Sequence, residues 1–166
     1  MRYAIVKLHQ FSGNKASIYS VVRYGEQETF LEKFIKENKD LFLSETKDIL
    51  KRLRTIGHLT GARFDFFKHN EGVPGDGVCA LYDKKKSNIR LYCIVYGSQL
   101  IIIGNGGPKP KSIRALQADD KLKNENYFMR WLSNKITERI RNREIKYIND
   151  YLDITGDFEF DNEDNE

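Results

Sequence analysis

The stretch IRLYCIVYGSQLIIIGNGGPKPK, residues 89–111, predicts the centre of the fold. Its first part alternates between two sets of side chains, and its second part, 99–104, is the most apolar run of the chain. Gly97 and Ser98 separate the two parts, which is typical of a β-hairpin. The first strand places Ile89, Leu91, Cys93 and Val95 on one face and Arg90, Tyr92, Ile94 and Tyr96 on the other. We therefore expect one core face and an opposite face that presents a cation beside two phenols.

The end of this stretch, GNGGPKPK at 104–111, lies between a strand and a helical segment, where nucleotide-binding proteins often hold a phosphate. A Walker loop needs many backbone N–H donors, and Pro108 and Pro110 remove two of them. A Rossmann fingerprint fails because its third glycine is absent. The prolines instead favour a stiff loop that holds out Lys109 and Lys111 to bind the backbone phosphates of a polymer.

The segments around this hairpin predict an α+β fold. Alternating runs predict strands, at 3–11, 16–24, 62–69 and 78–83. Apolar residues at helical spacing predict helices, at 26–40, at 44–57 and after residue 112. The first two helices are joined by a short connection and should form an antiparallel pair, and the last helix carries a stripe with Phe128, Trp131 and Ile136 for packing. We expect one domain over 1–149, including an N-terminal hairpin over 1–25.

Composition excludes several functional classes. A chain of 166 residues can bury a core without disulfides or a metal, and Cys79 and Cys93 lack the spacing of a zinc site, so we expect both as buried core residues. The histidines are scattered and no Gly-x-Ser-x-Gly motif occurs, which disfavours metal chemistry and serine nucleophiles. We therefore also expect no cofactor. Neither a signal peptide nor an apolar run of about 18 residues is present, so we expect no membrane association and a cytoplasmic location.

Charge is divided unevenly along the chain. The first 146 residues contain all 28 Lys and Arg against 16 acids, whereas the last 20 contain eight acids. The basic part favours a polyanionic partner, although ordinary solubility explains such charge about equally well. For residues 150–166 we expect an acidic, flexible tail; the alternative is a segment that folds over the basic face and competes with RNA.

Cations and phenols remain as the candidate site: Lys68, His69, Arg90, Tyr92, Tyr96, Lys109, Lys111 and Arg114. Such groups can cut RNA without metal, because the RNA's own 2′-OH can attack the adjacent phosphorus. The protein then assists removal of one proton, stabilises the charge at phosphorus and protonates the leaving 5′-oxygen. The alternative is that Arg90 and the tyrosines merely cover an exposed face of the sheet.

The order of elements over residues 26–140 resembles the RelE/ParE/HigB superfamily of toxins from type II toxin–antitoxin modules. The residues that carry the resemblance are IRLYCIVYGSQLIIIGNGGPKPKSIRAL, with an arginine at the start of the third strand and a Gly/Lys segment after the fourth. The resemblance implies a RelE-like antiparallel sheet packed against an N-terminal helical pair and followed by a C-terminal helix. It also implies an mRNA endonuclease, in some members ribosome-dependent, with a cognate antitoxin that is often a helix-turn-helix protein. Other members inhibit DNA gyrase.

By the same resemblance, Arg90 contacts the scissile phosphate, and Lys109 and Lys111 bind phosphates, as do Lys68 and Arg114. The tyrosine that RelE proper carries in its last helix is absent here. The proton-transfer residue therefore stays open between His69, Tyr92 and Lys68. A gyrase inhibitor of the ParE kind and a non-catalytic binding module remain as alternative functions.

Overall fold

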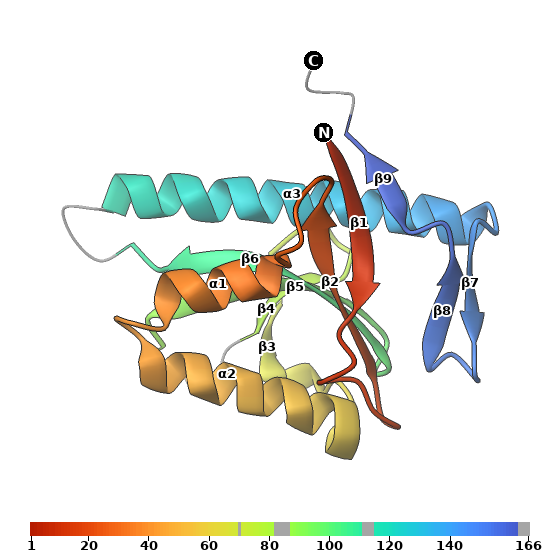
Figure 1. Ribbon diagram of the computed structural model, residues 1–166, viewed down its shortest axis with the longest axis horizontal. Helices are drawn as coiled ribbons and strands as arrows, with labels where there is room; N and C mark the ends of the chain where they lie inside the picture. The colour runs from red at the N-terminus through yellow and green to blue at the C-terminus, as the bar shows by residue number, and fades with distance from the viewer. Residues whose placement is uncertain (70, 82–86, 111–114, 163–166) are drawn as a thin grey trace.

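The computed structural model describes residues 1–69, 71–81, 87–110 and 115–162 (Figure 1). The first half contains β1 (Arg2–Lys7), β2 (Ser17–Arg23), α1 (Phe30–Asn38), α2 (Leu43–Thr55), a π-helical turn (Ile56–Thr60), a 3₁₀ turn (Phe64–Phe66), β3 (Phe67–Lys68) and β4 (Val78–Leu81). The second half contains β5 (Ile89–Tyr96), β6 (Leu100–Pro108), α3 (Ala115–Arg141), β7 (Ile145–Ile148), β8 (Asp153–Gly156) and β9 (Glu159–Asp161). None of the helices in these ranges is both long and apolar enough to cross a membrane.

Within the described ranges, seven strands form one sheet in the order β3-β4-β5-β6-β2-β1-β9, with β2 and β6 as its parallel pair. The predicted hairpins appear as β1–β2 and β5–β6, and the predicted helical pair appears as α1 and α2. A capping box of Thr29 and Glu32 begins α1. The protein is therefore an α+β protein with a mostly antiparallel sheet.

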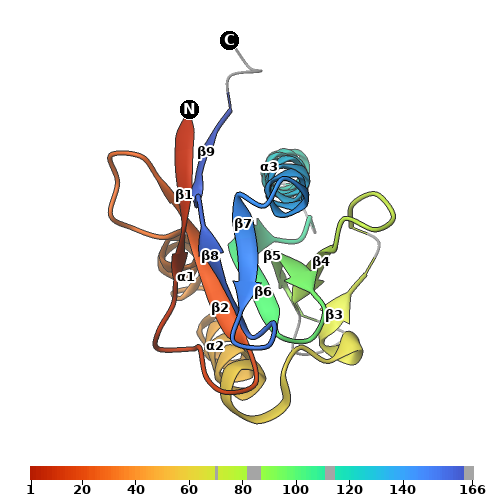
Figure 2. The same cartoon turned by 90° about the vertical axis from the view of Figure 1, so that its right-hand side faces the viewer.

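Helices cover both faces of this sheet, as Figure 2 shows with α3 viewed end-on. Phe34 of α1 and Leu53 of α2 belong to the buried cluster on one face, together with Leu91 of β5. Leu132 of α3 belongs to the cluster on the other face, together with Tyr92. The expectation of an open face around Arg90 and Tyr92 was wrong, because the apolar stripe of α3 packs there and leaves Tyr92 only 3% exposed.

The glycines of GNGGPKPK extend a strand rather than form a loop. β6 continues through Pro108, and Arg90 pairs across the ladder with Gly107. A Cβ on Gly106 would overlap the carbonyl oxygen of Arg90, and a Cβ on Gly104 would overlap Met129 of α3. The predicted stiff loop over 104–111 was therefore wrong for its first five residues, whose glycines let β5 and α3 approach β6 closely.

The C-terminal segment is built into the fold, contrary to the expectation of a flexible tail from residue 150. β8 pairs with β7, and β9 pairs with β1 at the edge of the large sheet. Ile154 is 3% exposed and Phe160 is 1% exposed, in the same buried cluster as Leu132. Apolar side chains that alternate with the acidic ones give this segment a buried face, so it orders as strands.

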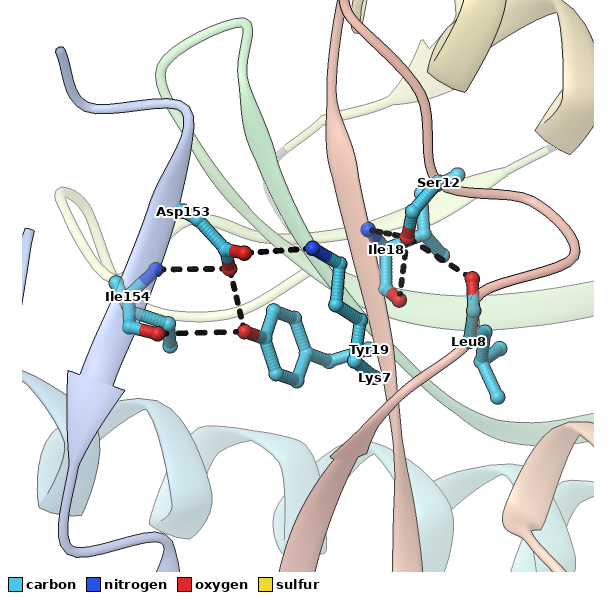
Figure 3. A network of polar contacts seen from close by, with 7 residues as sticks. All are labelled: Lys7, Leu8, Ser12, Ile18, Tyr19, Asp153 and Ile154. Atoms are coloured by element: carbon cyan, nitrogen blue, oxygen red, sulfur yellow. Dashed lines mark hydrogen bonds and ion pairs between the residues drawn. The ribbon is translucent and has the colours of Figure 1, made fainter. Parts of the chain in front are cut away.

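Figure 3 shows how β8 is joined to the N-terminal hairpin. The carboxylate of Asp153 accepts hydrogen bonds from Lys7 Nζ at 2.6 Å and from the Tyr19 hydroxyl at 2.5 Å. It also accepts one from the backbone N–H of Ile154 at 2.8 Å. Burial acts to raise the pKa of Asp153, but the bonds from Lys7 and Tyr19 lower it overall. The N-terminal hairpin and the C-terminal strands thus form one connected unit.

Candidate functional site

Arg90 lies near the start of β5, and its side chain is 20% exposed and contacts Tyr92, which belongs to the buried cluster on the α3 face. Nη1 of Arg90 donates to the Tyr92 hydroxyl at 3.5 Å and lies 3.9 Å from Oε1 of Glu71. The guanidinium therefore has a hydrogen-bond acceptor on one side and a carboxylate on another. Both contacts involve Nη1, so they orient one edge of the guanidinium.

Lys68 belongs to the same face of the sheet as Tyr92. Lys68 of β3 pairs with Ala80 of β4, and Ala80 pairs with Tyr92 of β5, so the three residues lie side by side across neighbouring strands. Directly paired residues of antiparallel strands point to the same face. Nζ of Lys68 lies 3.5 Å from Oε1 of Glu71, which places the same carboxylate oxygen beside both cations.

Glu71 is a member of this cluster that the sequence did not indicate. It belongs to a loop rich in turn residues, where no periodic pattern marks one carboxylate above another. In the structure its backbone carbonyl accepts a hydrogen bond from Asn126 Nδ2 of α3 at 2.6 Å, which ties this loop to the helix. Its side chain is 14% exposed, and no hydrogen-bond donor from the described part of the chain reaches Oε1. A nearly buried carboxylate oxygen with ion pairs but no such donor keeps lone pairs that can accept a hydrogen bond.

Tyr92 acts as a support in this cluster. Burial raises the pKa of its phenol, and the neighbouring Arg90 counteracts only part of that effect. The hydroxyl therefore stays protonated near neutral pH. It can hold Arg90 in place and donate a proton, but it cannot serve as a general base.

Two further lysines lie at the β6 side of Arg90. The backbone N–H of Lys109 donates to Asn88 at 2.8 Å, and Nζ of Lys109 donates to the hydroxyl of Ser87 at 3.3 Å. Lys121 of α3 donates to the carbonyl of Gly106 at 2.6 Å. Lys109 is thus held at the end of the ladder that contains Arg90, and Lys121 is a cation of this region that the sequence did not single out. The predicted residues Lys111 and Arg114 lie outside the described residues.

His69 is not part of the cluster around Arg90. Its ring stacks on Phe64 and lies near Phe67, which belongs to the buried cluster on the α1–α2 face. Lys68 and Tyr92 belong to the α3 face. The structure therefore brings together Arg90, Tyr92 and Lys68 from the predicted set, adds Glu71, and separates His69 from them.

The described residues contain no group of three or more His, Cys, Asp or Glu side chains placed to hold a metal ion. Cys79 and Cys93 face each other on paired strands with their sulfurs 3.5 Å apart, and both are buried thiols. Comparisons with protein-family models, with curated proteins and with solved structures give no match to this chain.

Proposed function

We propose that this chain is the toxin of a toxin–antitoxin pair, acts in the cytoplasm, and cuts mRNA without a metal ion. The observation that supports this most is the grouping of two cations, Arg90 and Lys68, around the single carboxylate of Glu71 on one face of the sheet. Cleavage by a 2′-OH needs one proton acceptor and positive charge at phosphorus, and this cluster contains both.

In the proposed reaction the phosphate that will be cut binds beside Lys68 and Arg90. The carboxylate of Glu71 takes the proton of the 2′-OH while that oxygen forms a bond to phosphorus. The bond from phosphorus to the 5′-oxygen breaks, and the leaving oxygen takes a proton from the ammonium of Lys68. The products are a 2′,3′-cyclic phosphate and a 5′-OH end.

The remaining groups have supporting parts. Arg90 stabilises the additional negative charge at phosphorus, and the Tyr92 hydroxyl keeps the guanidinium in position. Lys109 contributes positive charge further along the RNA backbone. A cognate antitoxin of the helix-turn-helix kind would keep the toxin inactive.

Induction of the protein in cells, followed by mapping of transcript ends, tests this function. We expect growth arrest with new 5′-OH ends in mRNA, and loss of both effects for Arg90→Ala. Arg141→Ala is the matched control, because Arg141 is an exposed arginine at the far end of α3. Early DNA damage without mRNA cleavage would instead identify a gyrase inhibitor. Normal growth with no cleavage would identify a binding module.

A further inference from the structure

Phe64 and His69 form a flat pair of rings at the surface. The Phe64 side chain is 78% exposed, and its ring stacks on the imidazole with 3.7 Å between centroids and 12° between planes. Nε2 of His69 lies 2.7 Å from the carbonyl oxygen of Phe64. Because a carbonyl only accepts hydrogen bonds, Nε2 carries the hydrogen and the imidazole is held in one orientation. One exposed ring is ordinary on a protein surface, but two rings locked in parallel are a preformed stacking surface.

The backbone beneath Phe64 is fixed by its neighbours in the chain. Phe66 is buried with the guanidinium of Arg52 4.1 Å from its ring centroid, and Phe67 is buried in the α1–α2 core. The N–H of Phe66 donates to the carbonyl of Arg63 at 3.1 Å, which closes the 3₁₀ turn. Two of the three phenylalanines in this segment thus anchor it, and the third is directed outward.

A groove of about 490 Å³ adjoins the ring pair. Its lining includes Phe64, His69, Pro74, Gly75 and Gly97. At Gly75 and Gly97 no atom of the described residues, apart from chain neighbours, lies within 4 Å of the position that a Cβ would take, so this part of the groove is open.

The loop that borders this groove is held at both ends. The carboxylate of Asp76 accepts hydrogen bonds from the N–H groups of Val73 and Val78, each at 2.9 Å. The hydroxyl of Ser133 on α3 donates to the backbone carbonyl of Asp76. The groove is therefore formed without a ligand.

This groove and the cluster of Lys68, Glu71 and Arg90 lie on either side of one strand edge. β3 is the outermost strand of the sheet, and no other strand among the described residues pairs with its outer edge. Lys68 belongs to the α3 face, and its side chain is 55% exposed, whereas the ring of His69 lies beside Phe67 on the other face. Consecutive residues thus direct a cation and an aromatic ring to opposite sides of the same edge.

We propose that the Phe64–His69 pair and its groove bind one unpaired base of a single-stranded RNA whose neighbouring phosphate lies at Lys68. Bases of single strands stack on exposed aromatic side chains, and a duplex base has no free face to offer. The exposed cations Arg63, next to Phe64 in the chain, and Lys68, next to His69, complement the negative backbone of such a strand. The identity of the strand as RNA rests on the proposed function, whereas the stacking surface is a feature of the structure.

An RNA strand that cannot be cut allows binding of the base to be measured independently of cleavage. The probe is a 2′-O-methylated oligouridine with one central 2-aminopurine, whose fluorescence is quenched when the base stacks. We expect the full-length protein to quench the probe, and Phe64→Leu to remove the quenching and weaken binding about 10-fold. Phe64→Trp should retain both. Tyr24→Leu is the control, because Tyr24 is 73% exposed and directly follows β2, which three strands separate from β3 in the sheet.

The outcomes are distinct for the two proposals. Binding by Phe64→Leu within twofold of the unchanged protein, or equal loss in Tyr24→Leu, would overturn the base site. Absence of binding by the unchanged protein would overturn it as well. Loss of quenching in Phe64→Leu alone would support the base site even if the protein cuts no natural RNA. Because Phe64 is exposed, its replacement should leave the melting temperature unchanged within about 2 °C.

Discussion

Replacement of Asp153 by Ala tests the finding that the C-terminal segment is part of the sheet. The change removes the carboxylate that accepts bonds from Lys7 and Tyr19. The Tyr19 hydroxyl is then left in a buried position with only the Ile154 carbonyl at 3.4 Å, which costs about 1–3 kcal/mol. The Lys7 side chain is 28% exposed and can turn to water, so loss of its ion pair with Asp153 adds about 1 kcal/mol. We expect a total of about 3 kcal/mol, which lowers the melting temperature by roughly 6–12 °C.

The control for this substitution comes from the same segment. Asp157 pairs with Arg139 at 3.1 Å, but its side chain is 54% exposed, so Asp157→Ala should destabilise by less than about 1 kcal/mol. Calorimetry or circular dichroism at neutral pH measures both variants. Equal melting temperatures for Asp153→Ala and the unchanged protein would refute the view that Asp153 anchors β8 to the hairpin.

The same carboxylate gives a pH dependence with a defined sign. Its pKa is lowered in the folded protein, so its ionised form stabilises the fold above the ordinary carboxyl pKa of about 4. This contribution is lost as the pH falls through the lowered folded value. The difference in stability between the unchanged protein and Asp153→Ala should therefore shrink at acidic pH. A difference that grows on acidification would contradict this assignment.

The remaining predictions concern the fold and the thiols. Gly106→Ala should lower the melting temperature by roughly 5–10 °C in a thermal scan, because the added Cβ overlaps the carbonyl of Arg90; an unchanged value would contradict the close approach of β5 and β6. Deletion of 150–166 should yield a protein with exposed core surface that binds a hydrophobic dye, whereas a flexible tail would be removed without effect. Cys79 and Cys93 should resist an aromatic disulfide reagent until the protein unfolds, because both thiols are buried and burial raises the pKa of Cys93; fast reaction in the native state would refute their burial.

Local patterns in the sequence predicted most of the strands and helices. Alternation of side chains identified the two hairpins, and helical spacing identified α1, α2 and the apolar stripe of α3. These signals depend on burial of one face of an element, which is a local property. The pairing of β9 with β1 was not predicted. The many acidic residues of the C-terminal segment favour exposure to solvent, and this signal was given more weight than the apolar Phe158 and Phe160.

The covering of the sheet by α3 could not be derived from one strand alone. The mixed face of β5 contains Arg90, which favours solvent, and Tyr92, which accepts either environment. The side of the sheet on which a helix packs depends on contacts between residues far apart in the chain. Glu71 was missed for a similar reason, since its place beside Arg90 results from the path of a loop that Asn126 holds.

The cluster also changes the interpretation of the predicted site. Arg90 contacts both Tyr92 and Glu71, and Lys68 contacts Glu71; in our proposal Glu71, rather than His69, is the proton acceptor. His69 instead belongs to the surface that we propose for a base. His69 follows directly after β3, whose two residues lie on opposite faces of the sheet, whereas Glu71 is placed by the loop that Asn126 holds.

The most direct test of the proposed reaction is RNA cleavage by purified protein in the presence of ribosomes and mRNA. The account predicts 5′-OH and 2′,3′-cyclic phosphate ends from the unchanged protein. Glu71→Gln should cut about 100- to 10,000-fold more slowly, Arg90→Ala should cut at least 100-fold more slowly, and Arg141→Ala should cut at the original rate. Full activity in folded Glu71→Gln and Arg90→Ala variants, or ends of a different chemistry, would contradict the account.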